Sequence, residues 1–506
     1  MAQKALPYEY EIEESKTGMT CLGGLPTYLD LAASVGLLRS LGRHLKIRSG
    51  DQGWTDRQMI LGLMLLNLVG GDCVDDIDKL EADEGFCKIL RKVETHGLRR
   101  KERRELKKRW RKGRSRTLPS ASAIFRYLAN FHDEGQEGLR EKGKAFIPAA
   151  NEQLKALGLI NRDMIGFEPI KEGEETATLD MDATLSATLK RSALFSYKGE
   201  QAYQPSNTYW HERGLLVHTE FRDGNVPAGY EQLRVLKEAL EYLPKWVNKV
   251  RLRSDTAGYQ HDLLGYCDKD DNKRFGKIEF AIGCDVTQEF RKAVAEVSEE
   301  QWTPFYQEVD GKLQETGRQW AEVCFVPNKI GHSKKGPEYR YLATREELKQ
   351  AELPGIEKSD NEYLFPVMRM KDQRYKVFGI VTNMDWAGEV LIPWLYQRCG
   401  KSEEAHAIMK NDFAGGRFPS EDFGENAAWW WIMILAYNLN VLMKRLVLGE
   451  SWVNKRMKAI RFSLINIAAR VIERSRRIWV RLSGSHPSSG LLIDIRCRIA
   501  QLEASG

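Results

Sequence analysis

The sequence predicts an α/β protein, in which a core of short strands and crossover helices lies between two mostly helical segments. From residue 166 on, short stretches alternate apolar and polar residues with the period of a strand, and helical stretches separate them. Before residue 166 and after residue 386, apolar residues recur with helical spacing instead. Strands interleaved with crossover helices indicate an α/β core.

We expect five segments along the chain. They are a mostly helical N-terminal region (1–165), a first part of the core (166–285), a β-rich insertion (286–385), a second part of the core with an acidic helix (386–450), and a basic helical region (451–506). Hydrophobic residues make up 42% of the chain, which excludes global disorder.

Capping signals place the helices of the N-terminal region. Thr55 fits the N-cap of a very apolar helix, 59–69, that ends at Gly70. Either Ser120 or Ser122 can cap a later helix with apolar residues along one side.

Period-two alternation places the strands of the core. Strands are expected at 176–182, 214–222, 247–254 and 277–284, with an amphipathic helix at 230–243. Shorter strand candidates in the insertion lie near 320–326, 339–342 and 375–382. From residue 386 the pattern predicts helix nearly to residue 481.

One long uncharged run has two readings. Residues 426–443 contain eighteen uncharged residues and have the length of a membrane span. Asn426, Asn438 and Asn440 favour a buried helix instead, and the N-terminus has no signal-peptide pattern. The eight cysteines form no CxxC pair, so we expect reduced thiols, a cytoplasmic location and no membrane partner.

Positive charge is concentrated in two places. Residues 99–116 carry a net +10 and residues 444–481 a net +9, although the whole chain carries only +6. Such polarisation suits a polyanion such as nucleic acid, whereas the simpler alternative is a solvated helical face. For the first cluster we expect contacts with DNA from Arg99, Arg100, Lys107, Lys108, Arg109, Arg111 and Lys112.

Two aspartates end strands of the expected core. Asp182 closes the first strand, and Asp255 ends the strand at 247–254. Asp180 shares the face of Asp182 because side chains alternate along a strand, so it is a rival for the same role. An aspartate at a strand end also often only caps the next turn.

A third acidic position lies on a helix near residue 400. Tyr396, Glu403 and Lys410 are spaced seven residues apart, or two helical turns, and therefore share one face. An acid between a hydroxyl and an ammonium suits a phosphate held beside a metal. The alternative is an exposed helix with ordinary charges.

Two further patterns have simpler structural explanations. Asp268, Asp270, Asn272 and Glu279 match part of a calcium-loop template, but Lys273 stands where that loop needs glycine. One interpretation of Trp429 to Trp431 is that they stack on an extruded base, but core packing is the simpler interpretation.

Together these residues resemble the DDE transposases of bacterial insertion sequences, in the branch with a Tyr-Arg-Glu-Lys signature, and most closely the thirteen-eighty group. The resemblance rests on LDMDAT (179–184), RSD (253–255) and the Tyr, Glu and Lys positions above, together with NLVGGDCVDDI (67–77), LPSASAIFRYL (118–128), the stretch 209–214, FRDGN (221–225) and the stretch 410–439. It implies a ribonuclease-H-like core with a β-rich insertion and a helical N-terminal DNA-binding region.

The resemblance assigns roles to single residues. It places the catalytic and metal-binding carboxylates at Asp182, Asp255 and Glu403, and DNA-phosphate contacts at Tyr396 and Lys410. Asp182 is preferred to Asp180 because Ala183-Thr184 follows it. The signature Arg position is Cys399, so its neighbour Arg398 is the candidate for that role.

The same resemblance implies a reaction. Three carboxylates can hold two Mg²⁺ ions, with Mn²⁺ as a substitute, for phosphodiester chemistry. We expect a homodimeric transposase that binds terminal inverted repeats and target DNA as its double-stranded partners, cleaves, and joins 3′ ends. The alternatives are a transposase-derived DNA-binding protein that does not cleave and a ribonuclease-H-like nuclease without strand transfer.

Overall fold

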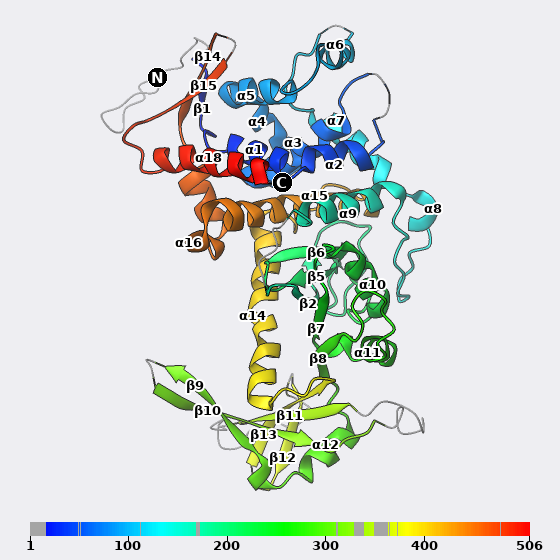
Figure 1. The fold of residues 1–506 in the computed structure, drawn as a ribbon. Coiled ribbons are helices and arrows are strands. Elements are labelled where there is room, and N and C mark those ends of the chain that lie inside the picture. Colours follow the sequence, from blue (N-terminus) through cyan, green and yellow to red (C-terminus); the bar gives the residue numbers. More distant parts are fainter. Residues whose placement is uncertain are drawn as a thin grey trace, which may run out of the picture.

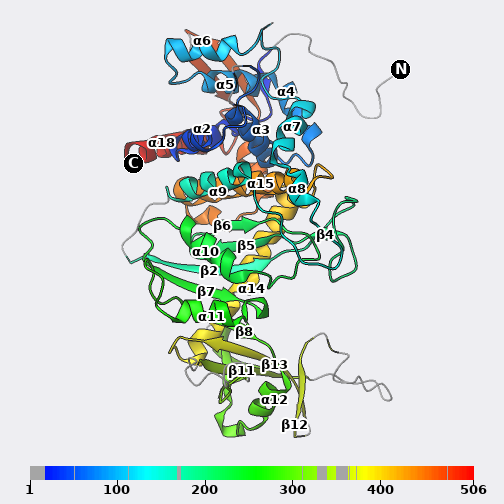
Figure 2. The same ribbon diagram turned by 90° about the vertical axis from the view of Figure 1, so that its right-hand side faces the viewer.

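The computed structural model arranges the chain in three tiers (Figures 1 and 2). A helical tier lies at one end, a mixed sheet with its helices lies in the middle, and a smaller antiparallel part of the same sheet lies at the other end. The described residues are 17–48, 50, 52–111, 113–167, 173–309, 312–327, 339–348, 363, 365–371, 373–475 and 477–505. Lys112, one of the expected DNA contacts, lies outside them.

The N-terminal tier is helical, as its capping signals predict. Its helices are α1 (Pro26–Ser34), α2 (Leu37–His44), α3 (Asp56–Val69), η1 (Val74–Asp76), α4 (Ile77–Ala82), α5 (Glu84–Glu94), α6 (Arg100–Lys108), α7 (Ala121–Leu128), η2 (Ala129–Phe131), α8 (Glu134–Glu137) and α9 (Glu152–Ile165). Thr55 caps α3 in a capping box with Gln58, and α3 ends at Gly70, whose φ of 94° is left-handed. Ser120, and not Ser122, caps α7.

The middle of the main sheet has the strand order β6-β5-β2-β7-β8. These strands are β2 (Thr176–Ala183), β5 (Ser206–Trp210), β6 (Leu215–Glu220), β7 (Lys249–Ser254) and β8 (Glu279–Cys284). The pairs β2–β7 and β7–β8 are parallel, whereas β5 is antiparallel to both β2 and β6. A small hairpin of β3 (Ser186–Ala187) and β4 (Ala202–Tyr203) leaves the sheet between β2 and β5.

Helices cover both faces of this sheet. In both views α10 (Gln232–Tyr242) and α11 (His261–Asp268) lie on one face, and α14 (Gly388–Asp412) lies on the other. Helix α14 has 25 residues, so it is about 37 Å long. It runs from the insertion, across β8, β7 and β2, to the helical tier (Figure 1).

The β-rich insertion extends the main sheet. Strand β13 pairs antiparallel with β8, so the strand order continues as β13-β11-β10-β9. The insertion contains η4 (Glu299–Gln301), β9 (Thr303–Val309), β10 (Lys312–Val323), β11 (Arg340–Glu347), β12 (Val367–Met370) and β13 (Gln373–Thr382), with α12 (Gln288–Ala295) beside them. The expected strand segments of the insertion all lie in or overlap these strands. The calcium template is not a loop site, because Glu279 lies within β8 and pairs with Lys249 and Arg251.

The uncharged run forms α15 (Phe423–Leu442), which continues as the π-helix η6 (Met443–Leu448). The stretch 423–448 is long and apolar enough to cross a membrane, but 83% of its most apolar window is buried inside the protein. It packs against α3 and α9. Trp429, Trp430 and Trp431 are all buried, so core packing is their role.

Three asparagines of α15 tie it to other parts of the chain. Asn438 accepts from Leu216 N (2.9 Å) and donates to Leu216 O and to Asn161 of α9. Asn440 accepts from the Tyr28 hydroxyl of α1 (2.7 Å). Asn426 donates to the Tyr203 hydroxyl (3.2 Å). Each buried amide is hydrogen-bonded, and these bonds offset the free-energy cost of removing it from water.

The C-terminal region is not wholly helical, which corrects the prediction. Short helices α16 (Glu450–Val453) and α17 (Met457–Ile460) and the π-helix η7 (Arg461–Ile465) are followed by two strands, β14 (Ala469–Arg474) and β15 (Arg477–Leu482), before helix α18 (Ser489–Ser505). Strand β14 also pairs with β1 (Met19–Thr20). Exposed Arg470 lies between buried Ala469 and Val471, and this period of two outweighs the helical composition.

Replacing Asn438 with Ala should destabilise the protein by about 2–4 kcal/mol. The change leaves the buried Leu216 N–H and the Asn161 Oδ1 atom without their amide partner, whereas Leu216 O keeps its hydrogen bond from Asn161 Nδ2. Each orphan costs about 1–3 kcal/mol. Chemical denaturation measures the loss. The exposed Asn454→Ala is the matched control, with an expected change below about 0.5 kcal/mol. Equal stability of the two variants would contradict the role of Asn438.

Candidate active site

Two of the expected carboxylates lie at the same edge of the sheet. Asp182 is in β2, and Asp255 directly follows β7. The two strands are parallel and pair Met181 with Ser254, so the two aspartates are next in register. Burial raises the pKa of both carboxyls, and the negative charge of Asp182 raises the pKa of Asp255 further. The sheet therefore brings two carboxylates into electrostatic contact.

Helix α14 presents three side chains to Asp182 from successive turns. Arg398 Nη1 lies 3.3 Å from Asp182 Oδ2, and Ser402 Oγ donates to the same oxygen at 2.9 Å. His406 Nδ1 lies 3.9 Å from it. These residues are spaced four apart and therefore form one stripe of the helix. The Arg398 guanidinium opposes the effect of burial on the pKa of both aspartates.

His406 is held as a neutral imidazole. Burial, together with the charges of Lys410 and Arg398, lowers its pKa to about 3. Asn207 Nδ2 lies 3.2 Å from His406 Nε2. Since an amide nitrogen only donates, Nε2 accepts and the ring proton sits on Nδ1, which faces Asp182. Thr219 Oγ1 donates to Asn207 Oδ1 at 2.6 Å and so fixes the amide.

Asp180 has a structural role, which leaves Asp182 as the candidate for the first carboxylate. The side chain of Asp180 is fully buried and accepts two hydrogen bonds from Arg253, at 2.6 and 2.8 Å. Arg253 also donates to Trp394 O of α14 and lies 4.9 Å from the centre of the Trp394 ring. Both Asp180 oxygens are thus used to fix α14 against the sheet.

Glu403 lies on α14 but outside the Asp182 stripe. It is exposed, and it directly follows Ser402, so its Cα is about 3.8 Å from that of Ser402. Successive helical residues point about 100° apart. The side-chain oxygens of Asp182, Asp255 and Glu403 do not all lie within 4.8 Å of one another, because the described residues form a single such group, elsewhere in the fold. The joint site of all three therefore stays a prediction.

Tyr396 and Lys410 lie at the two ends of the α14 site. Tyr396 shares a hydrogen bond with Thr344 (3.1 Å), and Lys410 donates to Leu185 O (3.2 Å). They are fourteen residues apart, which is about 21 Å along the helix axis. The two side chains are therefore too far apart to contact the same phosphate.

A cavity of about 590 Å³ opens beside Asp255. Its lining includes Asp255, Tyr396, Arg398 and Cys399, together with further basic side chains from the insertion: Arg318, Arg345 and Lys376. Arg398 Nε is buried and has no hydrogen-bond partner among the described residues. The wall of the cavity therefore combines the Asp255 carboxylate with basic side chains and with an Arg398 N–H group that has no hydrogen-bond partner. Such donors suit the binding of a phosphate.

The basic clusters divide into anchors and exposed surface. Helix α6 has no buried residue. It contains three of the expected DNA contacts, Arg100, Lys107 and Lys108, and a fourth, Arg99, is its N-cap. Arg109 instead donates to Gly53 O at 2.8 Å, and Arg111 is exposed. In the second cluster Lys444 is buried and donates to Val453 O, whereas β14 and β15 expose Arg470, Arg474, Arg477 and Arg481.

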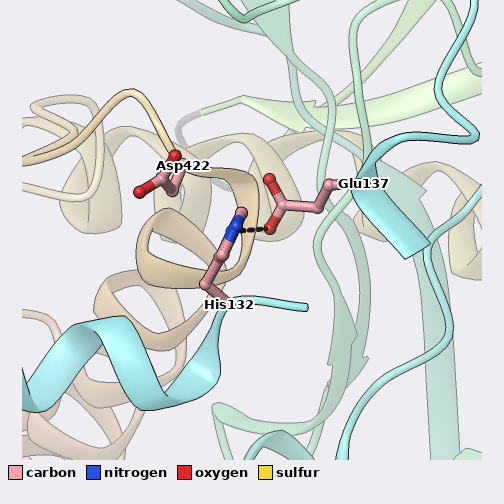
Figure 3. A group of neighbouring side chains, drawn as sticks. All are labelled: His132, Glu137 and Asp422. Carbon is pink, nitrogen blue, oxygen red and sulfur yellow. Dashed lines mark hydrogen bonds and ion pairs between the residues drawn. The ribbon is translucent and has the colours of Figure 1, made fainter. Parts of the chain in front are cut away.

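The group of three within 4.8 Å consists of His132, Glu137 and Asp422 (Figure 3). Glu137 accepts from Phe423 N (2.9 Å) and Gly424 N (2.7 Å) at the start of α15, and it pairs with His132 (2.7 Å). A Cβ at Gly424 would lie 2.2 Å from Phe131 O, so the segments meet closely. We interpret Glu137 as the cap of α15, because its oxygens already satisfy free helical N–H groups.

Sequence reasoning missed three residues of this site: Arg253, Ser402 and His406. Arg253 stands in the quoted RSD motif, but nothing in the pattern shows which acid it pairs with. The stripe Arg398, Ser402 and His406 has the spacing of one helix face. That four-residue spacing could have identified Ser402 and His406 as neighbours of Arg398 from the sequence.

Asp182→Asn and Asp255→Asn should each raise the melting temperature of the metal-free protein at pH 7. Because folding raises the pKa of both carboxyls, their contribution to stability is complete below the unfolded pKa and is lost as pH rises through the folded pKa. The gain over wild type should therefore shrink toward about pH 4. Exposed Asp271→Asn serves as the control, and lower melting temperatures for both site variants at pH 7 would contradict the account.

The comparison with protein-family models identifies one family. A family model described as "Transposase DDE domain group 1" matches residues 11–504. Among solved structures, the chain is similar to a piggyBac transposase in a synaptic complex with hairpin DNA, with a TM-score of 0.43 and 12% identity over 89% of this chain and 83% of that one. No curated protein matches the chain. Since the family model spans nearly the whole sequence, the chain belongs to the DDE transposases.

Proposed function

We propose that this transposase binds the terminal inverted repeats of an insertion sequence, cleaves the DNA there and joins the 3′ ends to target DNA. The observation that carries the proposal is the Asp182–Asp255 pair at the ends of adjacent parallel strands. Helix α14 supplies Arg398 beside it and Glu403 one residue beyond Ser402. The bacterial origin and the thirteen-eighty group are part of this proposal and rest on the sequence resemblance.

We also propose that the core is ribonuclease-H-like. The order β6-β5-β2-β7-β8, in which β5 alone runs opposite to the other four strands, supports this fold. In open sheets that contain parallel strands, ligands bind beyond the carboxyl ends of those strands. Asp182 and Asp255 lie at such ends.

The donor set fits Mg²⁺. Carboxylate oxygens are the ligands that Mg²⁺ prefers, and the ion keeps several waters and substrate phosphate oxygens. Asp182 and Asp255 would hold the metal, with Glu403 as the third ligand after its side chain turns toward them. Bound ions supply a nucleophile at neutral pH and stabilise the leaving oxygen.

The protein's own side chains would position the DNA. Arg398 is paired with Asp182 and has a spare Nε, so it can move to a phosphate once cations neutralise the carboxylates. Arg398 would thus act in place of the signature arginine, whose position in the sequence is occupied by Cys399. Tyr396 and the basic side chains of the cavity would contact one phosphate, and Lys410 another.

Exposed basic elements outside the core would bind the duplex. Helix α6 and the β14–β15 hairpin present arginines and lysines to solvent. Such contacts fix the register of a protein on DNA without reading its sequence. Two ends must meet for transposition, so we propose a homodimer on DNA, again from the resemblance.

One observation favours a second candidate, a DNA-binding protein that does not cleave. Glu403 is exposed and has no hydrogen bond or ion pair among the described residues, and Cys399 replaces the signature arginine. A strand-transfer assay with end-sequence DNA separates the candidates. Joined product supports the transposase, and cleavage without joining indicates a nuclease. A DNA mobility shift that does not depend on Mg²⁺, without cleavage, indicates a binding protein.

Asp255→Asn should lower DNA cleavage by at least about 100-fold and leave DNA binding largely unchanged. The amide keeps the hydrogen bond to Ala257 N but loses the charge that a metal needs, and losses around metal ligands reach this size. Cleavage and mobility-shift assays on one preparation measure both. Wild-type cleavage by this variant would show that the site is assigned wrongly.

Glu403→Gln should abolish cleavage, whereas the neighbouring Glu404→Gln should retain it. Both residues are exposed on α14, so the pair controls for loss of one negative charge on the helix. Glu404 lines a different pocket, with Tyr209 and Lys444. If the two variants cleave equally well, Glu403 is not the third carboxylate.

A further inference from the structure

The β3–β4 hairpin, defined here as residues 184–203, exposes large apolar side chains. Leu189 is 98% exposed, Tyr197 78% and Phe195 51%. They lie on one short segment that leaves the sheet at the end of β2. Grouped exposed apolar side chains mark a surface that contacts something else.

The backbone of this hairpin is held in place. Arg140 of the N-terminal tier donates to both oxygens of buried Asp223, at 2.6 and 2.9 Å, and to Ser192 O at 2.7 Å. Asp223 in turn accepts from Leu194 N (3.3 Å). This contact gives the FRDGN motif (221–225) its structural role, because its aspartate fixes the hairpin.

The base of the hairpin is packed as well as hydrogen-bonded. Tyr203 is buried among Phe221, Phe418 and Phe423, with ring centres 4.7–6.0 Å apart. Lys190 donates to Pro419 O (3.3 Å). A fixed backbone that still leaves its largest side chains exposed indicates a preformed contact surface rather than a loose loop.

The hairpin starts at the candidate active site. Thr184 is two residues after Asp182, and Lys410 of α14 donates to Leu185 O (3.2 Å). Leu189 lies seven residues after Asp182. Even a fully extended chain would span at most about 24 Å over that distance. That is about seven base pairs of duplex at 3.4 Å each.

The charge of the hairpin suits a nucleic acid. Arg191 and Lys198 are exposed beside the apolar side chains, and the Lys198 ammonium lies 5.9 Å from the centre of the Tyr197 ring. Glu200 is the one acidic residue in 184–203. Apolar side chains beside basic ones can bind unstacked bases and the adjoining phosphate backbone together.

We propose that the β3–β4 hairpin contacts the DNA strand flanking the scissile phosphate, with Leu189, Phe195 and Tyr197 against unstacked bases and with Arg191 and Lys198 on phosphates. The proposal rests on the proposed function, because it takes the scissile phosphate to lie at Asp182 and Asp255. It adds that the protein distorts the duplex at that position.

A triple variant, Leu189→Ala/Phe195→Ala/Tyr197→Ala, tests the proposal. All three side chains are exposed, so the fold should persist, and Phe462→Ala, 83% exposed near the C-terminus, is the matched control. Two duplexes of one element end are compared with Mg²⁺, one fully paired and one with mismatches beside the cleavage site. A 2-aminopurine base beside the site reports unstacking by its fluorescence.

The triple variant should cleave the paired duplex about ten-fold or more slowly than wild type, recover on the mismatched duplex, and lose the fluorescence rise. Wild-type behaviour of the triple variant, or equal loss on both duplexes, would overturn the hairpin proposal while the proposed function stands. A changed oligomeric state without DNA would instead make the surface a contact between copies. If wild-type protein cleaves neither duplex, the proposed function fails and the hairpin proposal with it.

Discussion

The buried ion pair between Asp180 and Arg253 is the contact on which the candidate site depends. Both side chains are fully buried, and the pair joins β2 to β7. Arg253 then reaches across to Trp394 O and so fixes α14. Burying two charges costs several kcal/mol per ion before their attraction offsets it, and removing one partner costs about 3–5 kcal/mol. The two strand ends and the helix therefore hold a common geometry, in which Asp182 meets Arg398, Ser402 and His406.

A second constraint connects the helical tier to this core. Helix α15 is buried along its whole length, and its asparagines hydrogen-bond to α1, α9, β6 and the base of the β3–β4 hairpin. Polar side chains within an apolar helix specify one packing arrangement, because any shift leaves a buried amide unpaired. These contacts therefore fix the helical tier relative to the sheet that carries the aspartates.

Much of the fold could be predicted from local patterns. Thr55 and Ser120 follow capping chemistry that acts within four residues, and period-two alternation located β2, β6, β7 and β8. It did not locate β5, all of whose residues are buried. The β14–β15 hairpin could not be predicted in the same way, because its arginines hid a short alternation and its partner β1 lies more than 400 residues away. Likewise, the sequence identified the two strand-end aspartates. It could not show that Asp180 pairs with Arg253 or that His406 points toward Asp182, because both depend on tertiary contacts. Glu403 shows the limit most clearly, since helical spacing gives its face but not its direction relative to a sheet elsewhere in the chain.

The central claim is that Asp182, Asp255 and Glu403 hold paired divalent ions at the end of the sheet. Anomalous scattering from Mn²⁺ in crystals of the protein bound to an element end tests it most directly. We expect two Mn²⁺ peaks about 3.5–4 Å apart, with both aspartates and a turned Glu403 as ligands. Mn²⁺ bound only at His132, Glu137 and Asp422, or a metal site that leaves Glu403 in solvent, would contradict the account.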